Sequence, residues 1–254
     1  MVAFGWRLYS SRNPGWEEYY VDYAALKAQI KTIQRQEREG LHDVAVNENA
    51  LLLRMLTQQL GTASAFWDER CERYERELDG IKQRVTEMRD AAARGSPRAA
   101  AATDEASDLT PFRSVLLEEQ KETALLKEYV LLRAQLERLQ EFQRLNQEAV
   151  RKIAKKNAKQ NPSFAGTIDM AELLDKQSFM LPAQTNHPVA LLKSGVAVEQ
   201  SLLDQFGQSK IVEMWMWLRL MDMERRVESL GSYQLRDRKT MKELGDNKQQ
   251  GVSH

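Results

Sequence analysis

The chain has 254 residues, with 37 Lys+Arg balanced by 37 Asp+Glu, and 42% of its residues are hydrophobic. This length and apolar content suffice for a folded core in one large domain or two small ones. A net charge of zero excludes a general electrostatic attraction to nucleic acid or to an anionic membrane. Any electrostatic function must therefore come from a local cluster of charge.

The cysteine count and the hydropathy pattern indicate the compartment. Cys71 is the only cysteine, which excludes an internal disulfide and a cysteine-based zinc site, and we expect it to be a small buried hydrophobic residue. The N-terminal segment "MVAFGWRLYSSRNPGW" lacks the apolar stretch of a signal peptide. No segment reaches the roughly 18 to 20 apolar residues of a membrane span. We therefore expect a cytoplasmic protein without a transmembrane segment.

The first predicted helix follows Pro14 and Gly15, near which it should begin. Its apolar residues recur in steps of four and three, as on one face of a helix. They are Tyr19, Tyr23, Leu26, Ile30 and Ile33. The composition agrees, because Gly and Pro are sparse, at 12 and 6 residues, and helix-favouring residues dominate.

Two longer series show the same spacing and predict two long helices. The second series comprises Leu60, Trp67, Cys71, Tyr74, Leu78, Ile81, Val85 and Met88. The third comprises Leu125, Tyr129, Leu132, Leu136, Leu139, Phe142, Leu145, Val150 and Ile153. Between them, residues 91–111 lose the periodicity and collect Gly, Pro, Ser and an alanine run, which indicates a flexible insertion.

Helices of this length can bury their apolar faces only against one another. We therefore predict an all-α fold, an elongated antiparallel helical bundle with two long core helices, a short N-terminal helical segment and smaller C-terminal helices. After Gln160 the segment "NPSFAGT" should break the third helix. Shorter helices are expected over 168–179 and 188–206, another over 210–230, and a disordered tail after it. This divides the chain into a domain over 1–207, an extra Met/Trp-rich helix over 208–232 and a tail over 233–254.

A basic cluster, "RKIAKKNAK" at 151–159, lies at the end of the third predicted helix. Four lysines share one helical face because they are spaced i, i+3, i+4 and i+7. They are Lys152, Lys155, Lys156 and Lys159, and no carboxylate lies between Glu148 and Asp169. Lysines at a helix C-terminus also complement the helix dipole, so the cluster has two interpretations, a helix-end preference or an anion site.

Four motifs in order favour the anion site, because together they resemble the SPX domain family. The chain has Phe4-Gly5, a Pro-x-Trp at 14–16, "YAALK" at 23–27, and Leu145-Asn146 before "KIAKKNAK" at 152–159. The charge-rich segment at 47–81, followed by a variable insertion, also fits the family. The resemblance covers residues 1–165 firmly and extends loosely to about 207.

The resemblance implies a helical module that binds inositol polyphosphates and pyrophosphates and reports cellular phosphate status. Its phosphate-binding residues would be Tyr23, Lys27, Lys152, Lys155, Lys156 and Lys159, with Lys31 and Arg7 as further candidates. Val2, Ala3 and Trp6 stand where family members often carry two lysines, and Arg7 would substitute for one of them. Asn157 and Ala158 also depart from the pattern, which we expect to alter affinity and helix packing. Tyr23 belongs to the apolar face of its helix as well, so it has a core role or a phosphate role, or both.

No catalytic, metal-binding or cofactor motif is present. The chain lacks a phosphate-binding loop, a dinucleotide fingerprint and a zinc-protease motif, and His42, His187 and His254 are isolated. We therefore expect neither an enzyme nor a cofactor requirement, and no direct contact with nucleic acid. The segment 214–223, "MWMWLRLMDM", is interpreted either as core packing or as an adaptable surface for a protein partner.

Three functions remain open at the level of sequence. The first is an inositol polyphosphate sensor that acts on a protein partner, such as a transcription factor, a transporter or a polymerase subunit. The second is a regulatory subunit of a phosphate transporter or polyphosphate polymerase complex. The third is a structural helical adaptor without a ligand. Through a partner, the first two would also allow a nuclear or membrane-peripheral location.

Overall fold

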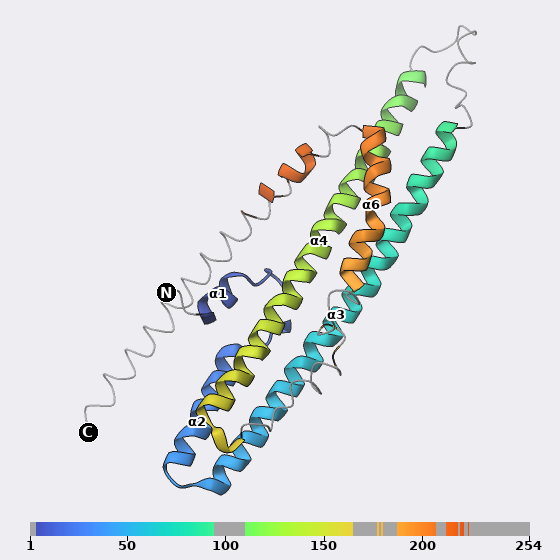
Figure 1. Ribbon diagram of the computed structural model, residues 1–254. Coiled ribbons are helices and arrows are strands. Elements are labelled where there is room, and N and C mark those ends of the chain that lie inside the picture. The colour runs from blue at the N-terminus through green and yellow to red at the C-terminus, as the bar shows by residue number, and fades with distance from the viewer. Residues whose placement is uncertain are drawn as a thin grey trace.

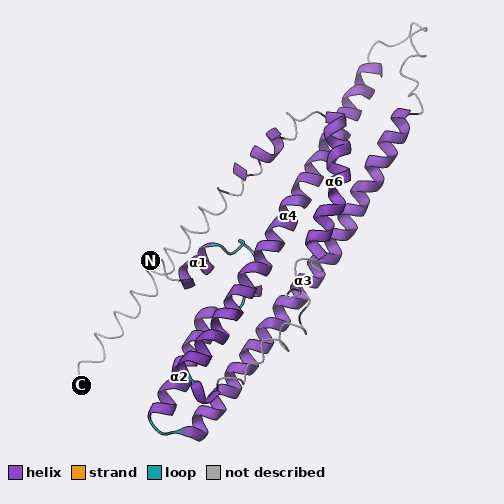
Figure 2. Ribbon diagram, in the orientation of Figure 1, coloured by secondary structure: helices purple, strands orange, loops and turns teal. Residues whose placement is uncertain are grey.

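The computed structural model describes residues 4–93, 110–164, 177, 179, 187–206, 212–217, 219–220 and 223. Four long elements form its framework, α2 (Tyr23–Arg38), α3 (His42–Ala93), α4 (Thr110–Gln160) and α6 (His187–Phe206). A short α1 (Phe4–Ser10) and the 3-10 turn η1 (Glu17–Tyr19) precede them, and the 3-10 turn η3 (Pro162–Phe164) follows α4. The described residues contain no strand (Figure 2), so the all-α prediction is confirmed.

The two long helices α3 and α4 lie side by side and give the molecule its elongated shape (Figure 1). With 52 and 51 residues, each is about 77 Å long. The helix α2 packs against one end of this pair, and α6 packs against the other half. Helices that follow one another run antiparallel, as predicted, whereas α2 and α4 run parallel. Val21 contacts Asn146 and Ile30 contacts Asn161, so residue numbers rise together along the two helices.

The start of α2 differs from the predicted position. Instead of beginning near Gly15, the helix begins at Tyr23, because the Asp22 carboxylate accepts hydrogen bonds from the amides of Ala24 and Ala25. The residues before it form the turn η1 and an extended linker. Tyr19 therefore lies outside the helix to which its spacing assigned it.

An aromatic cluster holds the N-terminal linker against the long helices. The ring of Phe142 on α4 lies 6.1, 4.8 and 5.2 Å from the rings of Trp16, Tyr20 and Phe66. Phe142 has no exposed surface. Burial raises the pKa of Tyr20 to about 12, and its hydroxyl accepts hydrogen bonds from Asn13. The linker is thus anchored between α3 and α4.

Buried amide side chains set the register of the N-terminal region on α4. The Asn146 side chain accepts a hydrogen bond of 2.8 Å from the Val21 amide and donates one to the Phe142 carbonyl. Asn13 donates to the Arg138 carbonyl at 3.1 Å. Unpaired buried polar groups are costly, so these bonds strongly favour a single alignment. They determine which part of α2 faces which part of α4.

The helix α6 confirms the helix expected over 188–206. The Tyr129 hydroxyl of α4 donates to the Gly195 carbonyl at 3.0 Å, and Arg133 pairs with Glu199. A Cβ at position 195 would lie 3.4 Å from the Tyr129 hydroxyl, so the absent side chain permits this close contact. Cys71 is buried as predicted, and burial raises the pKa of its thiol to about 12.

Several predicted segments lie partly or wholly outside the described residues. The insertion over 91–111 is described only where α3 ends and α4 begins, and 168–179 only at Gln177 and Phe179. Of the helix over 210–230, residues 212–217, 219–220 and 223 are described and helical, and the tail over 233–254 is not described. Among the described helices, none is both long and apolar enough to cross a membrane.

Candidate polyanion-binding site

The exposed face of α2 carries the first half of the candidate site. Its apolar residues Leu26, Ile30 and Ile33 are buried against the bundle. Lys27 and Lys31 are exposed, and Tyr23 is half-buried one turn before Lys27. Residues spaced i, i+4 and i+8 follow one side of a helix, so the two ammonium groups lie in line after the tyrosine.

The C-terminal end of α4 carries the second half. Ile153 and Asn157 are buried, whereas Lys155 and Lys159 are exposed. Lys152 and Lys156 are half-buried, because they lie between the buried and the exposed faces of the helix. The four lysines therefore share one face, as predicted, and two of them border the neighbouring elements.

The parallel register of α2 and α4 brings the two halves together. Asn161, directly after α4, donates to the Ile30 carbonyl at 3.3 Å, which places the end of α4 beside Lys31. The pKa of Lys156 is lowered, first by burial and then by the positive charges of Lys27, Lys31 and Lys159. Cations from two distant sequence regions thus act on one another. We call this group, Lys27, Lys31, Lys156 and Lys159, the lysine cluster.

No described carboxylate neutralises the lysine cluster, since none of its members forms an ion pair with a described residue. Elsewhere in the described part of the chain, several basic groups are paired, for example Lys82 with Asp79 at 3.0 Å. Repulsion of this kind destabilises a fold slightly, so an uncompensated cluster is unfavourable unless an anion binds. The arrangement is suited to a ligand that carries several negative charges.

Phe4 connects both halves of the site to α1. The Lys152 ammonium lies 4.7 Å from the centre of the Phe4 ring, and this ring meets the Tyr23 ring edge-on at 4.9 Å. Burial raises the pKa of Tyr23. Tyr23 therefore packs its ring against α1 at the margin of the lysine cluster, so its packing role is observed and its phosphate role stays a prediction.

Besides Lys152, which contacts the Phe4 ring, two more lysine and arginine candidates from the sequence are not joined to the cluster. Lys155 is exposed, and its charge is not among those that lower the pKa of Lys156. Arg7 lies within α1, but its side chain is outside the described part of the structure. The phosphate-binding role of these two residues, like that of the other candidates, stays a prediction.

Sequence reasoning missed the amide pair that closes this end of the bundle. Asn157 was considered only as a departure from a family pattern, yet it is buried and accepts a hydrogen bond of 2.9 Å from Asn161. The spacing of four residues was visible in the sequence. The partner Ile30 lies 131 residues away and could not be inferred from local pattern.

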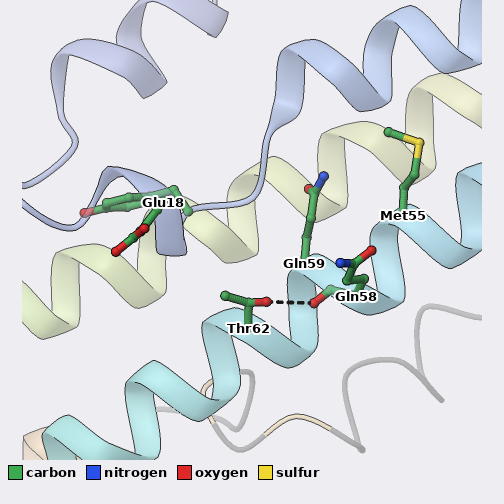
Figure 3. A pocket seen from close by; sticks show the side chains of 6 residues that line it. Glu18, Met55, Gln58, Gln59 and Thr62 are labelled. Carbon is green, nitrogen blue, oxygen red and sulfur yellow. Dashed lines mark hydrogen bonds between the residues drawn. The ribbon is translucent and has the colours of Figure 1, made fainter.

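The hollows elsewhere on the bundle are less suited to a polyanion. One of about 270 Å³ lies beside η1 and α3, and among its labelled lining residues Glu18 is the charged one (Figure 3). A second of about 470 Å³ lies between α3 and α4 and includes Arg73 and Arg84. These arginines are already paired with Glu77 and Glu128, respectively. The described residues also contain no cluster of ligands suited to a metal ion.

Replacing Lys156 with methionine should stabilise the ligand-free protein. The change keeps the apolar stem and removes repulsive pairs, which are worth about 0.2–0.5 kcal/mol each. Because the folded-state pKa lies below 10.5, the folded state binds fewer protons than the unfolded state, so the penalty is full at neutral pH and disappears above about pH 10.5. Urea unfolding near neutral pH should show the gain, and added salt should reduce it.

The matched control is Lys82→Met, which breaks the pair with Asp79 and relieves no such repulsion. It should leave the free energy of unfolding unchanged or slightly reduced. Equal stabilisation by both substitutions would mean that Lys156 is not under specific repulsion from its neighbours.

The fold and its charge distribution define an all-α bundle with a polycationic face at one end. Among solved structures, the chain is similar to the SPX domain of Chaetomium thermophilum glycerophosphodiester phosphodiesterase 1, in complex with inositol hexakisphosphate. The TM-score is 0.53 at 20% identity, over 78% of this chain and 98% of that chain. No family model and no curated protein sequence matches the chain. The chain has the SPX-domain fold, which confirms the resemblance at the level of structure.

Proposed function

We propose that the protein binds inositol polyphosphates or inositol pyrophosphates at the lysine cluster. The observation that carries this proposal is the convergence of Lys27 and Lys31 on α2 with Lys156 and Lys159 on α4, aligned by the Asn161–Ile30 hydrogen bond, without a described carboxylate that pairs with them. The inositol hexakisphosphate bound to the similar SPX domain supports the ligand class. A ring that carries several phosphates supplies the charge density that this cluster requires.

The candidate residues would contact the ligand in different ways, according to their position. Lys27, Lys31, Lys156 and Lys159 would contact phosphates directly, and Tyr23 would donate its hydroxyl from the margin. Lys152 would reach the ligand by leaving the ring of Phe4, and Lys155 and Arg7 would add outer contacts. Lysine suits this task because a flexible ammonium can meet phosphates in many orientations.

The expected binding free energy is large enough to be measured. A charge-assisted hydrogen bond contributes about 1.5–3 kcal/mol, so three or four of them, with about 4.5–12 kcal/mol in total, reach the roughly 8 kcal/mol of a micromolar Kd in the upper part of this range. Binding should weaken with salt because much of the site is exposed. Specificity would follow the number of phosphates engaged.

Calorimetric titration of inositol hexakisphosphate into the full chain at low and high salt tests the proposal. We expect a Kd on the order of micromolar at low salt, a clear loss of affinity at high salt, and much weaker binding of inorganic phosphate. Titration of inositol hexakissulfate, which has the same ring and fewer charges, separates charge count from ring shape. A folded protein that takes up none of these ligands would instead be a structural adaptor.

The same proposal includes coupling of phosphate status to a protein partner, in a cytoplasmic setting and without catalysis. A transcription factor, a transporter or a polymerase subunit would be the partner. Exposed apolar residues on the segment 212–223 support a protein contact, since Met216 and Trp217 project into solvent while Met214 and Trp215 pack against the bundle. A role as regulatory subunit of a transporter or polymerase complex is the form this coupling would take in a membrane-associated assembly.

A further inference from the structure

The turn between α2 and α3 forms the end of the bundle next to the lysine cluster (Figure 1). Three apolar side chains project into solvent there, Leu41, Val44 and Val46, with exposed fractions of 47%, 40% and 46%. We call Leu41 and Val44 the apolar tip. They are three positions apart at the start of α3 and can form one local patch, whereas Val46 lies two positions after Val44 and faces another side of the helix.

The local structure gives no reason for the apolar side chain at position 41. Gly40, at a φ of 73°, ends α2 in a Schellman motif, in which the Leu41 amide donates to the Gln36 carbonyl. The residue in this place usually packs its side chain on the last turn of the helix. Here that turn presents Arg35 and Gln36, so Leu41 has no apolar partner of this kind and remains exposed.

A row of cations leads from the lysine cluster to this tip. Lys27, Lys31, Arg35 and Arg38 are exposed and spaced i, i+4, i+8 and i+11 along one side of α2. Lys31 and Arg38 are separated by seven residues, about 10 Å along the helix. An apolar element at a membrane surface enters the boundary between headgroups and acyl chains by about 5–10 Å. With the tip at that depth, Lys31 and its neighbours on α4 would lie at the level of the headgroups.

The charge at the tip argues against a general attraction to anionic lipid. Arg35 and Arg38 are offset by Glu37, Glu39 and Asp43. The positive charge that no described carboxylate offsets lies farther from the tip, in the lysine cluster. The ligand must therefore be a lipid whose headgroup carries several phosphates and extends away from the membrane plane. Such a headgroup can contact the lysine cluster while the tip is inserted in the membrane.

We propose that the protein docks on membranes that contain phosphorylated phosphatidylinositol, with the apolar tip inserted and the headgroup held by the lysine cluster. This inference rests on the proposed function, because it uses the same cations and the same chemistry of clustered phosphates. It adds the source of the ligand, a lipid headgroup, and a second contact that a free inositol phosphate cannot make.

Vesicle sedimentation of the full chain tests the proposal. The probes are phosphatidylcholine vesicles alone, with phosphatidylserine, or with phosphatidylinositol bisphosphate at the same total charge. We expect sedimentation with the last of these. Leu41→Ser/Val44→Ser should lower the affinity for these vesicles about tenfold or more, through lost apolar contact, and leave the calorimetric affinity for free inositol hexakisphosphate unchanged.

The matched control is Leu131→Ser/Val196→Ser. It removes one exposed leucine and one exposed valine, with exposed fractions of 45% and 59%, from α4 and α6, away from the tip. It should bind vesicles as the unchanged protein does. Equal loss in both variants, or full binding by the tip variant, would overturn the insertion of the tip.

The remaining outcomes separate this inference from the proposed function. Binding of free inositol hexakisphosphate without vesicle binding would overturn the membrane source and keep the ligand site. If the protein binds neither inositol hexakisphosphate nor the vesicles, both proposals are wrong. Equal binding to phosphatidylserine vesicles would mean that the protein recognises negative charge in general rather than clustered phosphates. If the protein alone sediments with twice the mass of one chain, and the tip variant does not, the apolar tip would be a contact between two copies of the chain.

Discussion

Replacing Lys27 and Lys156 together with alanine should reduce the affinity for inositol hexakisphosphate by roughly 10²- to 10⁴-fold. The estimate follows from two charge-assisted hydrogen bonds of about 1.5–3 kcal/mol each, at about 1.4 kcal/mol per factor of ten. Lys27 lies on α2 and Lys156 on α4, and the positive charge of Lys27 contributes to the lowered pKa of Lys156 in the folded protein. Calorimetric titration at one fixed salt concentration measures the change.

The matched control is Lys82→Ala/Lys193→Ala, which alters the net charge by the same amount at sites on α3 and α6. It should change the affinity less than about threefold, because distant exposed charges are screened by salt. Similar losses in both double variants would show that binding depends on overall charge rather than on a site. The single variants Lys27→Ala and Lys156→Ala then report whether the two contacts are coupled.

Truncating Phe142 to alanine should lower the free energy of unfolding by about 3–5 kcal/mol, a large part of the stability of an ordinary domain. Its ring is fully buried and meets Trp16, Tyr20 and Phe66, and its carbonyl accepts a hydrogen bond from Asn146. Removal would leave a cavity at the junction of the N-terminal linker with α3 and α4. Urea unfolding followed by circular dichroism measures the loss.

Leu131→Ala on the same helix is the control for this change. Leu131 is 45% exposed, so its truncation should cost no more than about 0.5 kcal/mol. Phe142→Leu should fall between the two, because it retains part of the buried volume. A loss below about 1 kcal/mol for the alanine variant would contradict a central packing role for this ring.

The periodic apolar residues were sufficient to predict the helical architecture. Apolar residues that recur mostly three or four positions apart, from Leu60 to Met88 and from Leu125 to Ile153, identify the buried faces of α3 and α4. The start of α2 was misplaced, because Tyr19 continues the spacing while the capping carboxylate of Asp22 determines where the helix begins. Local hydrogen bonds at a helix terminus therefore took precedence over the pattern of apolar residues.

The candidate site was predictable only in part. The four lysines on α4 share a face as a direct result of helical geometry, and the motif at Tyr23 to Lys27 pointed to the partner face on α2. The contact of Lys152 with Phe4 and the pairing of Asn161 with Ile30 join residues more than 100 positions apart. Such contacts depend on the packing of whole helices, so no local spacing reveals them.

The parallel alignment of α2 and α4 has a consequence for biosynthesis. Lys27 and Lys31 leave the ribosome more than 100 residues before the lysines that complete the cluster, and the contacts that align them span 125 and 131 residues. A nascent chain therefore exposes half of the cluster, without the other half, until α4 has emerged and docked. Since the cluster needs both halves, an anion that binds it would favour chains in which α4 has emerged and docked on α2 over shorter nascent chains. Ligand binding would thereby stabilise the docking of α4 during synthesis, before the chain is complete.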